Sequence, residues 1–310
     1  MTPMTPMTLM SSNTLLLYFE EDQATADRLA QAAALPLAPI HRHHFPDGEI
    51  KLRLPVPLPQ KVVLLRSLHQ PNEKLVELLL TASAARTLGA THLTLVAPYL
   101  AYMRQDIAFQ PGEAVSQRII GRFLAGLFDA VITVDPHLHR IATLTEAIPT
   151  GDAIVLSGAT LLADLIHQRR QRPLLVGPDE ESAQWVAQAA ARHGFDYAVC
   201  RKVRHGDREV VIELPATPVT SRAVVLLDDV ASSGHTLAQA ARGLLAAGAT
   251  TVDVAVTHAL FSEGAVPLIK EAGVNEIWST DCIPHPSNAV AMAPLIAAAL
   301  LKQSTLGAST

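Results

Sequence analysis

Short runs of valine, leucine and isoleucine alternate with longer segments of helical pattern along most of this chain. Strands that are apolar at nearly every position are typical of a parallel sheet covered by helices on both faces. Their regular alternation with helices predicts an α/β fold with mainly parallel sheets. The expected strands are 15–19, 61–67, 92–97, 130–134, 173–176, 209–214, 223–227, 251–257 and 276–280. The expected helices are 23–34, 73–88, 114–127, 159–168, 181–193, 236–247 and 264–272.

Two pairs of segments resemble each other at a nearly constant offset. VVLLRSLHQPNEKL from Val62 aligns with VVLLDDVASSGHTL from Val224, and LGATHLTLVAP from Leu88 aligns with AGATTVDVAVT from Ala247. The repeat reflects either convergence of two ordinary α/β units or two related domains, and the shared order favours related domains. A chain of 310 residues has room for both. We expect a disordered tail at 1–12, domains at 13–150 and 151–302, and a second tail at 303–310.

The charge and the cysteine content limit the functions and the cellular compartments that we expect for this chain. A formal net charge of −5 argues against a nucleic-acid binder held by phosphate contacts. Cys200 and Cys282 form no CxxC pair, so a reducing, cytoplasmic setting is expected. The first residues do not have the pattern of a signal peptide, and no apolar stretch is long enough to span a membrane.

The segment VVLLDDVASSGHTL carries the strongest indication of a ligand site. An apolar strand ends in Asp228 and Asp229, and a short Ser/Gly loop then enters a helix near Thr236. Ligands of open α/β sheets lie beyond the carboxyl ends of the strands, and a loop entering a helix directs backbone N–H groups at an anion. Two carboxylates beside such a loop suit sugar hydroxyls or a metal ion. The alternative is a capped turn with a solvated acidic pair, and spacing alone leaves both open.

Basic side chains mark two further segments. Lys202 and Arg204 are two residues apart, so in an extended segment both point the same way, either toward a phosphate or as a surface charge pair. Arg104 offers a planar fork of donors for a phosphate or a stacked base, and Gln105 can read a base edge. The alternative for Arg104 is an ion pair with Asp106.

A turn and a histidine segment complete the candidates. Gly48 permits a turn that places Asp47 and Glu49 at a loop tip, where their carboxylates can accept from an amino group or a hydroxyl, although an ordinary β-turn has the same pattern. His137 and His139 follow a strand and can ligate a metal or contact a phosphate, although an isolated histidine is usually structural. Neither G-x-x-x-x-G-K-[ST] nor G-x-G-x-x-G occurs, so neither a P-loop nor a dinucleotide site is expected.

These segments, taken in order, resemble the ribose-phosphate diphosphokinase (PRPP synthetase) family. They are FPDGEI at 45–50, PYLAYMRQD at 98–106, FQPGEAVS at 109–116, VDPHLHR at 134–140, VGPDEESAQW at 176–185, RKVRHGD at 201–207 and the acidic-pair loop. The resemblance runs from about residue 14 to residue 301, and PDEESAQW is similar to the archaeal-type branch. It implies two related type I phosphoribosyltransferase-like domains, with the ATP-site motifs in the first and the ribose 5-phosphate loop in the second.

The resemblance also implies roles for individual residues. ATP would be bound by Phe45, Asp47, Gly48, Glu49, Arg104, Gln105 and Asp106. Ribose 5-phosphate would be bound by Arg204, Asp228, Asp229, Ser232, Ser233, Gly234, His235 and Thr236. Lys202 and Arg204 would be catalytic, and His137 with Asp179 would hold Mg²⁺. The loop at 45–49 would reach a neighbouring subunit's nucleotide site, which implies a homo-oligomer of at least two chains.

The implied reaction transfers the β,γ-diphosphoryl group of Mg-ATP to the C1 hydroxyl of ribose 5-phosphate, giving PRPP and AMP. A phosphoribosyltransferase would share the acidic-pair loop but has no use for FPDGEI or MRQD. A catalytically silent regulatory subunit is the other alternative, and the retention of Lys202, Arg204, His137 and Asp179 argues against it. One departure from the family is His235, where glycine is usual, and this residue leaves the phosphate affinity open.

Overall fold

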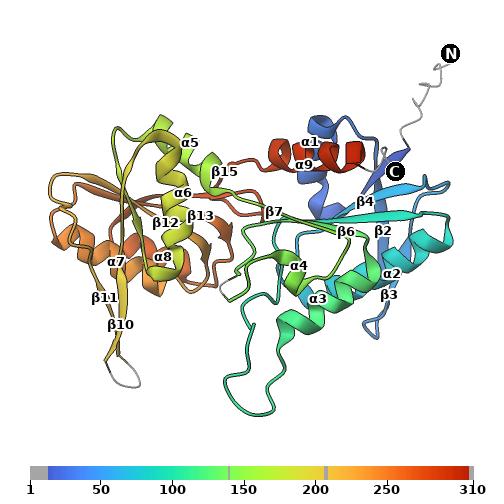
Figure 1. Ribbon diagram of the computed structural model, residues 1–310, viewed down its shortest axis with the longest axis horizontal. Helices are drawn as coiled ribbons and strands as arrows, with labels where there is room; N and C mark the ends of the chain where they lie inside the picture. Colours follow the sequence, from blue (N-terminus) through green and yellow to red (C-terminus); the bar gives the residue numbers. More distant parts are fainter. Residues whose placement is uncertain (1–12, 139, 206–208, 307–310) are drawn as a thin grey trace.

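The computed structural model describes residues 13–138, 140–205 and 209–306. These residues form two halves that lie side by side, each a largely parallel sheet flanked by helices (Figure 1). The predicted α/β fold is therefore confirmed. Within the described ranges, no helix is both long and apolar enough to cross a membrane.

The first half is built on a sheet with the strand order β3-β2-β1-β4-β5-β6-β7. Neighbouring strands are parallel except β2 and β3, which form an antiparallel hairpin. The strands are β1 (Thr14–Phe19), β2 (Leu37–His44), β3 (Ile50–Arg53), β4 (Lys61–Leu65), β5 (His92–Ala97), β6 (Ala130–Val134) and β7 (Asp152–Leu156).

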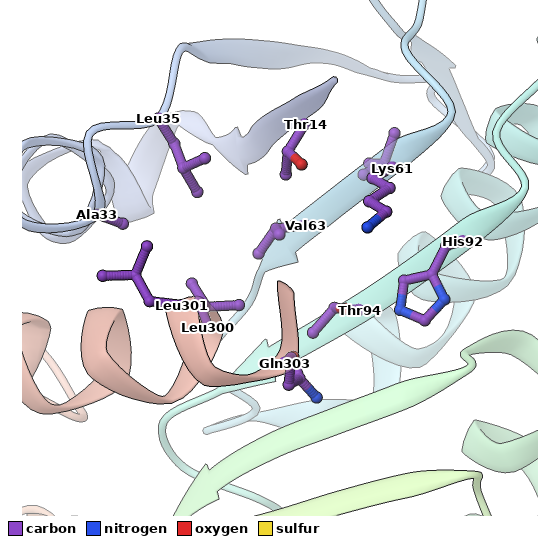
Figure 2. Close-up of a pocket in the computed structure, with 11 residues that line it drawn as sticks. Thr14, Ala33, Leu35, Lys61, Val63, His92, Thr94, Leu300, Leu301 and Gln303 are labelled. Atoms are coloured by element: carbon purple, nitrogen blue, oxygen red, sulfur yellow. The ribbon is translucent and has the colours of Figure 1, made fainter. Parts of the chain in front are cut away.

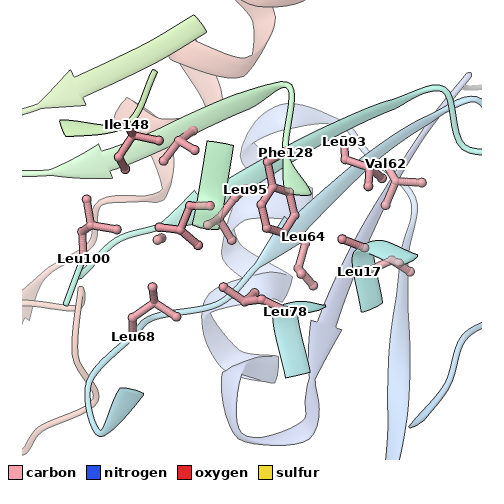
Figure 3. Close-up of a cluster of buried hydrophobic side chains, with 14 of the residues drawn as sticks. Leu17, Val62, Leu64, Leu68, Leu78, Leu93, Leu95, Leu100, Phe128 and Ile148 are labelled. Carbon is pink, nitrogen blue, oxygen red and sulfur yellow. The ribbon is translucent and has the colours of Figure 1, made fainter. Parts of the chain in front are cut away.

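Helices cover both faces of the first sheet. On one face, Leu78 of α2 and Leu124 of α3 pack with Leu64 and Leu95 of the sheet in one buried cluster, part of which Figure 3 shows. Full burial of one such leucine contributes about 1.5–3 kcal/mol. The opposite face is covered by α1 and α9. The helices are η1 (Glu20–Asp22), α1 (Gln23–Ala33), α2 (Pro71–Thr87), α3 (Ser116–Leu127), α4 (Leu144–Ala147) and α9 (Ala293–Leu306).

The second half is built on a parallel sheet with the order β15-β14-β13-β12-β8-β9. A separate antiparallel hairpin, β10–β11, projects from it (Figure 1). The strands are β8 (Leu174–Gly177), β9 (Asp196–Val199), β10 (Arg201–His205), β11 (Glu209–Glu213), β12 (Ala223–Ala231), β13 (Thr251–Ala259), β14 (Val274–Thr280) and β15 (Asn288–Val290). The helices are α5 (Ala159–Arg169), η2 (Glu180–Ser182), α6 (Ala183–His193), α7 (His235–Ala246) and α8 (Ala265–Glu271).

The two sheets share one topology. The order β2-β1-β4-β5-β6-β7 in the first half corresponds to β9-β8-β12-β13-β14-β15 in the second. This correspondence makes β4 equivalent to β12 and β5 equivalent to β13, as the sequence repeat predicts. The helices that follow the last strands are exchanged between the halves. Helix α5 follows β7 but packs with α6 on the second sheet, whereas α9 follows β15 but packs with α1 on the first.

This exchange divides the chain differently from the limits expected at 150 and 302. Strand β7 and helix α9 both belong to the first half. Helix α9 also continues to Leu306, into the segment expected to be a tail, and Gln303 Nε2 donates a hydrogen bond to Asp152 at 2.7 Å. The expected tail at 1–12 lies outside the described residues. The domain limits stay a proposal.

Candidate active site

Loops from both halves meet at one cavity of about 230 Å³, at the carboxyl ends of the strands. The first half contributes Arg104, after β5, and His137, after β6. The second half contributes Asp179 and Glu181 after β8, the acidic pair Asp228 and Asp229, residues 230–234, Thr236 and Leu237. Side chains that the sequence assigned to different ligands therefore line a single cavity.

The acidic pair lies within β12, which extends past its predicted end at Leu227 to Ala231. Asp229 is buried, with 3% of its surface exposed, and its Oδ2 lies 2.8 Å from Nδ1 of His137. This hydrogen bond joins the two halves at the cavity. The backbone N–H of Asp229 also donates to Oδ1 of Asp228 at 3.0 Å.

The carboxylates of the cavity differ in their pKa values. Burial and the charge of Asp229 raise the pKa of Asp228 well above its ordinary value. Burial acts in the same direction on Asp229, but the hydrogen bond and charge of His137 outweigh it, so the pKa of Asp229 is lowered. Burial and the neighbouring Glu181 raise the pKa of Asp179, and the charge of Lys202 opposes that rise. The cavity thus concentrates negative charge that a cation would neutralise.

The Ser/Gly loop turns from β12 into α7 at Gly234. This residue has φ +78°, and a Cβ there would lie 3.0 Å from the Ile269 side chain and 3.1 Å from the Ala265 carbonyl oxygen. Glycine is therefore required both for the conformation and for the space. Helix α7 begins at the next residue, His235, and helix N-termini attract anions. His235 is exposed and lies outside the cavity lining, whereas Thr236 belongs to it.

The predicted catalytic pair lies on the β10–β11 hairpin. Lys202 is exposed and does not line the cavity, and its positive charge opposes the rise in the pKa of Asp179. Arg201 lies at the base of the hairpin, and its Nε is 3.7 Å from Oε1 of Glu180. Arg204 pairs with Val210 in the strand ladder, and its side chain lies outside the described residues, as does His139.

The three residues of the Arg-Gln-Asp segment point in different directions. Arg104 lines the cavity. The side-chain oxygen of Gln105 accepts a hydrogen bond from the Ser116 hydroxyl at 3.1 Å. Asp106 is buried and forms an ion pair with Arg140 at 2.6 Å, instead of the pair with Arg104 that the sequence left open. Asp106 therefore links the Arg-Gln-Asp segment to the segment that carries His137.

The loop at 45–49 forms the tip of the β2–β3 hairpin. Gly48 has φ +93°, and the backbone N–H of Phe45 donates to Glu49 O at 2.8 Å, which closes a tight turn. The tip is exposed and lies on the side of the first half away from the second half (Figure 1). Phe45, Asp47, Gly48 and Glu49 are therefore not brought to the cavity of their own chain.

The donor set of the cavity fits Mg²⁺ with few protein ligands. Among the described residues, no group of three or more His, Cys, Asp and Glu side chains is close enough to hold a metal ion by itself. Mg²⁺ prefers oxygen ligands and usually keeps several waters beside one or two carboxylates. Asp179, Glu181, Asp228 and Asp229 supply such oxygens in one cavity. Glu181 was not among the predicted site residues, although it follows the predicted metal ligand Asp179 by only two positions.

A second cavity lies at the opposite end of the first sheet (Figure 2). Thr14, Lys61 and His92, which begin β1, β4 and β5, line it together with residues of α9. Its volume is about 60 Å³, and one water takes about 30 Å³ of liquid. Both its size and its place at the amino ends of the strands make it unsuited to a nucleotide.

Comparison with known proteins agrees with this geometry. A family model described as the N-terminal domain of ribose phosphate pyrophosphokinase matches residues 14–127, and one described as a phosphoribosyl transferase domain matches residues 145–281. A ribose-phosphate pyrophosphokinase of Methanopyrus kandleri is 37% identical over 276 residues, 88% of this chain and 94% of that protein. The chain belongs to the ribose-phosphate pyrophosphokinase family.

Other relatives place the chain in the same family. A ribose-phosphate pyrophosphokinase of Methanosarcina acetivorans is 34% identical, covering 90% of this chain and 96% of that protein. Both relatives are archaeal, as the predicted resemblance to the archaeal-type branch requires. The crystal structure of phosphoribosylpyrophosphate synthetase from Mycobacterium smegmatis has a TM-score of 0.81 at 24% identity and covers 93% of this chain and 97% of that one. That likeness supports the fold.

Proposed function

We propose that this chain is a ribose-phosphate pyrophosphokinase, which makes PRPP and AMP from ATP and ribose 5-phosphate. The observation that carries the proposal is the cavity at which Asp228, Asp229 and the Ser/Gly loop of one half face Arg104 and His137 of the other. A sugar-phosphate site that faces a second site for a nucleotide suits transfer between two substrates. A phosphoribosyltransferase would need only the first of these sites.

Ribose 5-phosphate fits the second-half side of the cavity. Its phosphate would lie on the loop at 232–236 and the N-terminus of α7, and its ring hydroxyls would lie near Asp228 and Asp229. A volume of about 230 Å³ falls below the roughly 300–1,000 Å³ of sites for drug-sized ligands. The cavity therefore suits one small substrate, with ATP extending outward past Arg104.

The nucleotide site would be completed by a second copy of the chain. The hairpin tip at 45–49 is exposed and directed away from its own cavity, which supports the predicted role of Phe45, Asp47 and Glu49 in a neighbour's site. The active form would then be a homo-oligomer of at least two chains.

In the reaction, the C1 oxygen of ribose 5-phosphate attacks the β-phosphorus of ATP. The bond from that phosphorus to the α,β-bridging oxygen breaks, AMP leaves, and the hydroxyl proton passes to solvent. Lys202 and Arg204 stabilise charge on the phosphoryl oxygens, which is where phosphoryl transfer gains most of its rate. Mg²⁺, held by Asp179 and His137, would supply further neutralisation of the diphosphate.

The test is AMP formation from Mg-ATP, measured by chromatography with and without ribose 5-phosphate. The proposal requires AMP that depends on the sugar phosphate and appears in equal amount with PRPP. Pyrophosphate released from PRPP only when a nucleobase is added would identify a phosphoribosyltransferase. Absence of both activities would leave the silent regulatory subunit as the better reading.

A further inference from the structure

The residue that follows strand β6 is bonded to both halves of the molecule: its backbone N–H donates to the Leu156 carbonyl oxygen of β7 at 2.8 Å, and its side chain is held mainly by the second half. Asp135, the residue after β6, is 4% exposed. Its Oδ2 accepts from the backbone N–H of Gly158 at 2.8 Å and from the Thr257 hydroxyl at 2.7 Å, and its Oδ1 accepts from Trp185 Nε1 at 3.0 Å. Trp185 and Thr257 belong to the second half. Both oxygens of this carboxylate are therefore occupied within the protein.

The second half also contacts the backbone at the end of β6. Nε2 of His258, in β13, lies 2.9 Å from the carbonyl oxygen of Val134 and 3.3 Å from that of Asp135. Asp135 has φ +36°, in the left-handed region, which non-glycine residues adopt only when their surroundings hold them there. Two residues further on, His137 hydrogen-bonds Asp229. The left-handed turn at Asp135 thus sets the course of the short segment that delivers His137 to the cavity.

We infer that Asp135 is a positioning residue, which fixes the left-handed turn after β6 against the second half and so holds His137 in contact with Asp229. Asp135 lines a neighbouring cavity of about 870 Å³ and not the cavity of about 230 Å³, and its carboxylate already accepts three hydrogen bonds. Its influence on the reaction therefore passes through His137. The inference rests on the proposed function for its kinetic readout.

The repeated fold supplies a matched control at Asp281. This residue follows β14, the strand equivalent to β6, and is also buried. Its Oδ1 accepts from the backbone N–H of Met292, just before α9, as Asp135 accepts from Gly158 just before α5. Its Oδ2 accepts from Arg28 of α1, the equivalent of α6. Asp281 thus has the same structural task, but Ile283 stands where the first repeat has His137.

The experiment compares Asp135→Asn with Asp281→Asn. An amide in place of the Asp135 carboxylate sets an NH₂ group against the fixed donor of either Gly158 or Trp185, so the turn must shift. We expect turnover to fall about 10–100-fold, because a misplacement of about 1 Å can cost on the order of 10²-fold. In crystals of Asp135→Asn, the distance from His137 Nδ1 to Asp229 Oδ2 should exceed the hydrogen-bonding range. Asp281→Asn should leave turnover and the His137–Asp229 distance unchanged. It should lower the melting temperature about as much as Asp135→Asn does.

A purely structural role predicts equal kinetics for the two variants and an unchanged His137–Asp229 distance in both, and that result would overturn the inference. Should Asp135→Asn fail to fold, Thr257→Val removes a single donor and is expected to lower turnover about 2–10-fold with the same lengthening of the distance. Unchanged turnover and distance in Thr257→Val would equally count against it. If the wild-type chain makes no AMP, the proposed function fails, and the crystallographic distance alone decides the inference.

Discussion

Replacing the two aspartates of the acidic pair should move stability in opposite directions. Asp228 lies beside a second carboxylate, and burial with the charge of that neighbour raises its pKa. Asp229 is bonded to His137, which lowers its pKa. With metal removed by EDTA, Asp228→Asn removes a half-buried carboxylate that its neighbour repels, whereas Asp229→Asn removes a buried carboxylate paired with His137.

The magnitudes follow from these environments. Relief of an unfavourable site charge commonly adds about 0.5–2 kcal/mol to the free energy of unfolding, which is the gain we expect for Asp228→Asn. Asp229→Asn loses a hydrogen bond to a charged group and leaves His137 poorly paired, at a cost of about 1.5–3 kcal/mol. Both variants lose charged acceptors for the sugar hydroxyls, so each should bind ribose 5-phosphate about 10–100-fold more weakly.

The pH dependence of the free energy of unfolding tests the pKa shifts of Asp228 and Asp229 independently. A carboxyl whose pKa is raised in the folded state releases its proton more readily when unfolded, so its contribution to stability is complete below the unfolded value of 3.8 and is lost as pH rises through the folded value. The advantage of Asp228→Asn should therefore be absent below about pH 4 and grow above it. For Asp229, whose pKa is lowered, the stabilisation is present above the unfolded value and is lost as pH falls.

Chemical denaturation from pH 4 to 8 and calorimetric titration with ribose 5-phosphate would measure these effects. Asp196→Asn, on an exposed side chain paired with Arg222, is the control and should change stability by less than about 0.5 kcal/mol. A loss of stability in Asp228→Asn as large as that in Asp229→Asn would refute the assignment of their charges. A fall in ATP affinity with unchanged ribose 5-phosphate affinity would show that the two substrate sites are exchanged.

Three further predictions concern the hairpins and the first half. Lys202→Ala should lower turnover on the order of 10²–10³-fold with little change in calorimetric substrate affinity, and near-normal turnover would remove Lys202 from the catalytic group. Mixing Lys202→Ala with a chain carrying Asp47→Ala and Glu49→Ala should restore AMP production, unless each chain builds its site alone despite subunit exchange proven by mass spectrometry. Glu77→Ala removes one of the three carboxylates paired with the buried Arg66 and leaves Glu21 and Asp22, so it should cost about 1.5–3 kcal/mol in urea denaturation; a cost below about 1 kcal/mol would mean that the two remaining carboxylates suffice.

The sequence predicted the central strands well and the edge strands poorly. Strands β5 and β6 coincide with their predicted ranges because every position in them after His92 is apolar or buried. Strands β2, β3, β7, β9, β10 and β15 were missed, because they carry mixed polar residues and lie at a sheet edge, beside an edge strand or in the separate hairpin. The exchange of α5 and α9 was not predicted either: α9 was missed as a helix, and the apolar residues of α5 do not specify which of two similar sheets they will cover.

The candidate site was predicted to a similar degree. Arg104, His137, Asp179 and the acidic pair do line one cavity, because each lies near or beyond the carboxyl end of a strand and parallel strands end at a common edge. The sequence could not show that Asp106 turns inward to Arg140, or that Asp135 is held by the second half. Both depend on contacts between segments far apart in the chain. The assignments to ATP, ribose 5-phosphate and metal stay predictions.

The repeat explains why only one half carries an acidic pair at this point. Arg66 follows β4 where Asp228 ends the equivalent part of β12, so both occupy the same place in the repeated fold. In the first half the guanidinium is 1% exposed and is closed in by Asp22 at 2.7 Å and Glu77 at 2.6 Å. The positive charge of Arg66 is neutralised by ion pairs inside the protein, whereas the carboxylates of the acidic pair line a cavity. Arg104 and His137 of the first half line the same cavity as the acidic pair, so the chemistry of the pair depends on both halves.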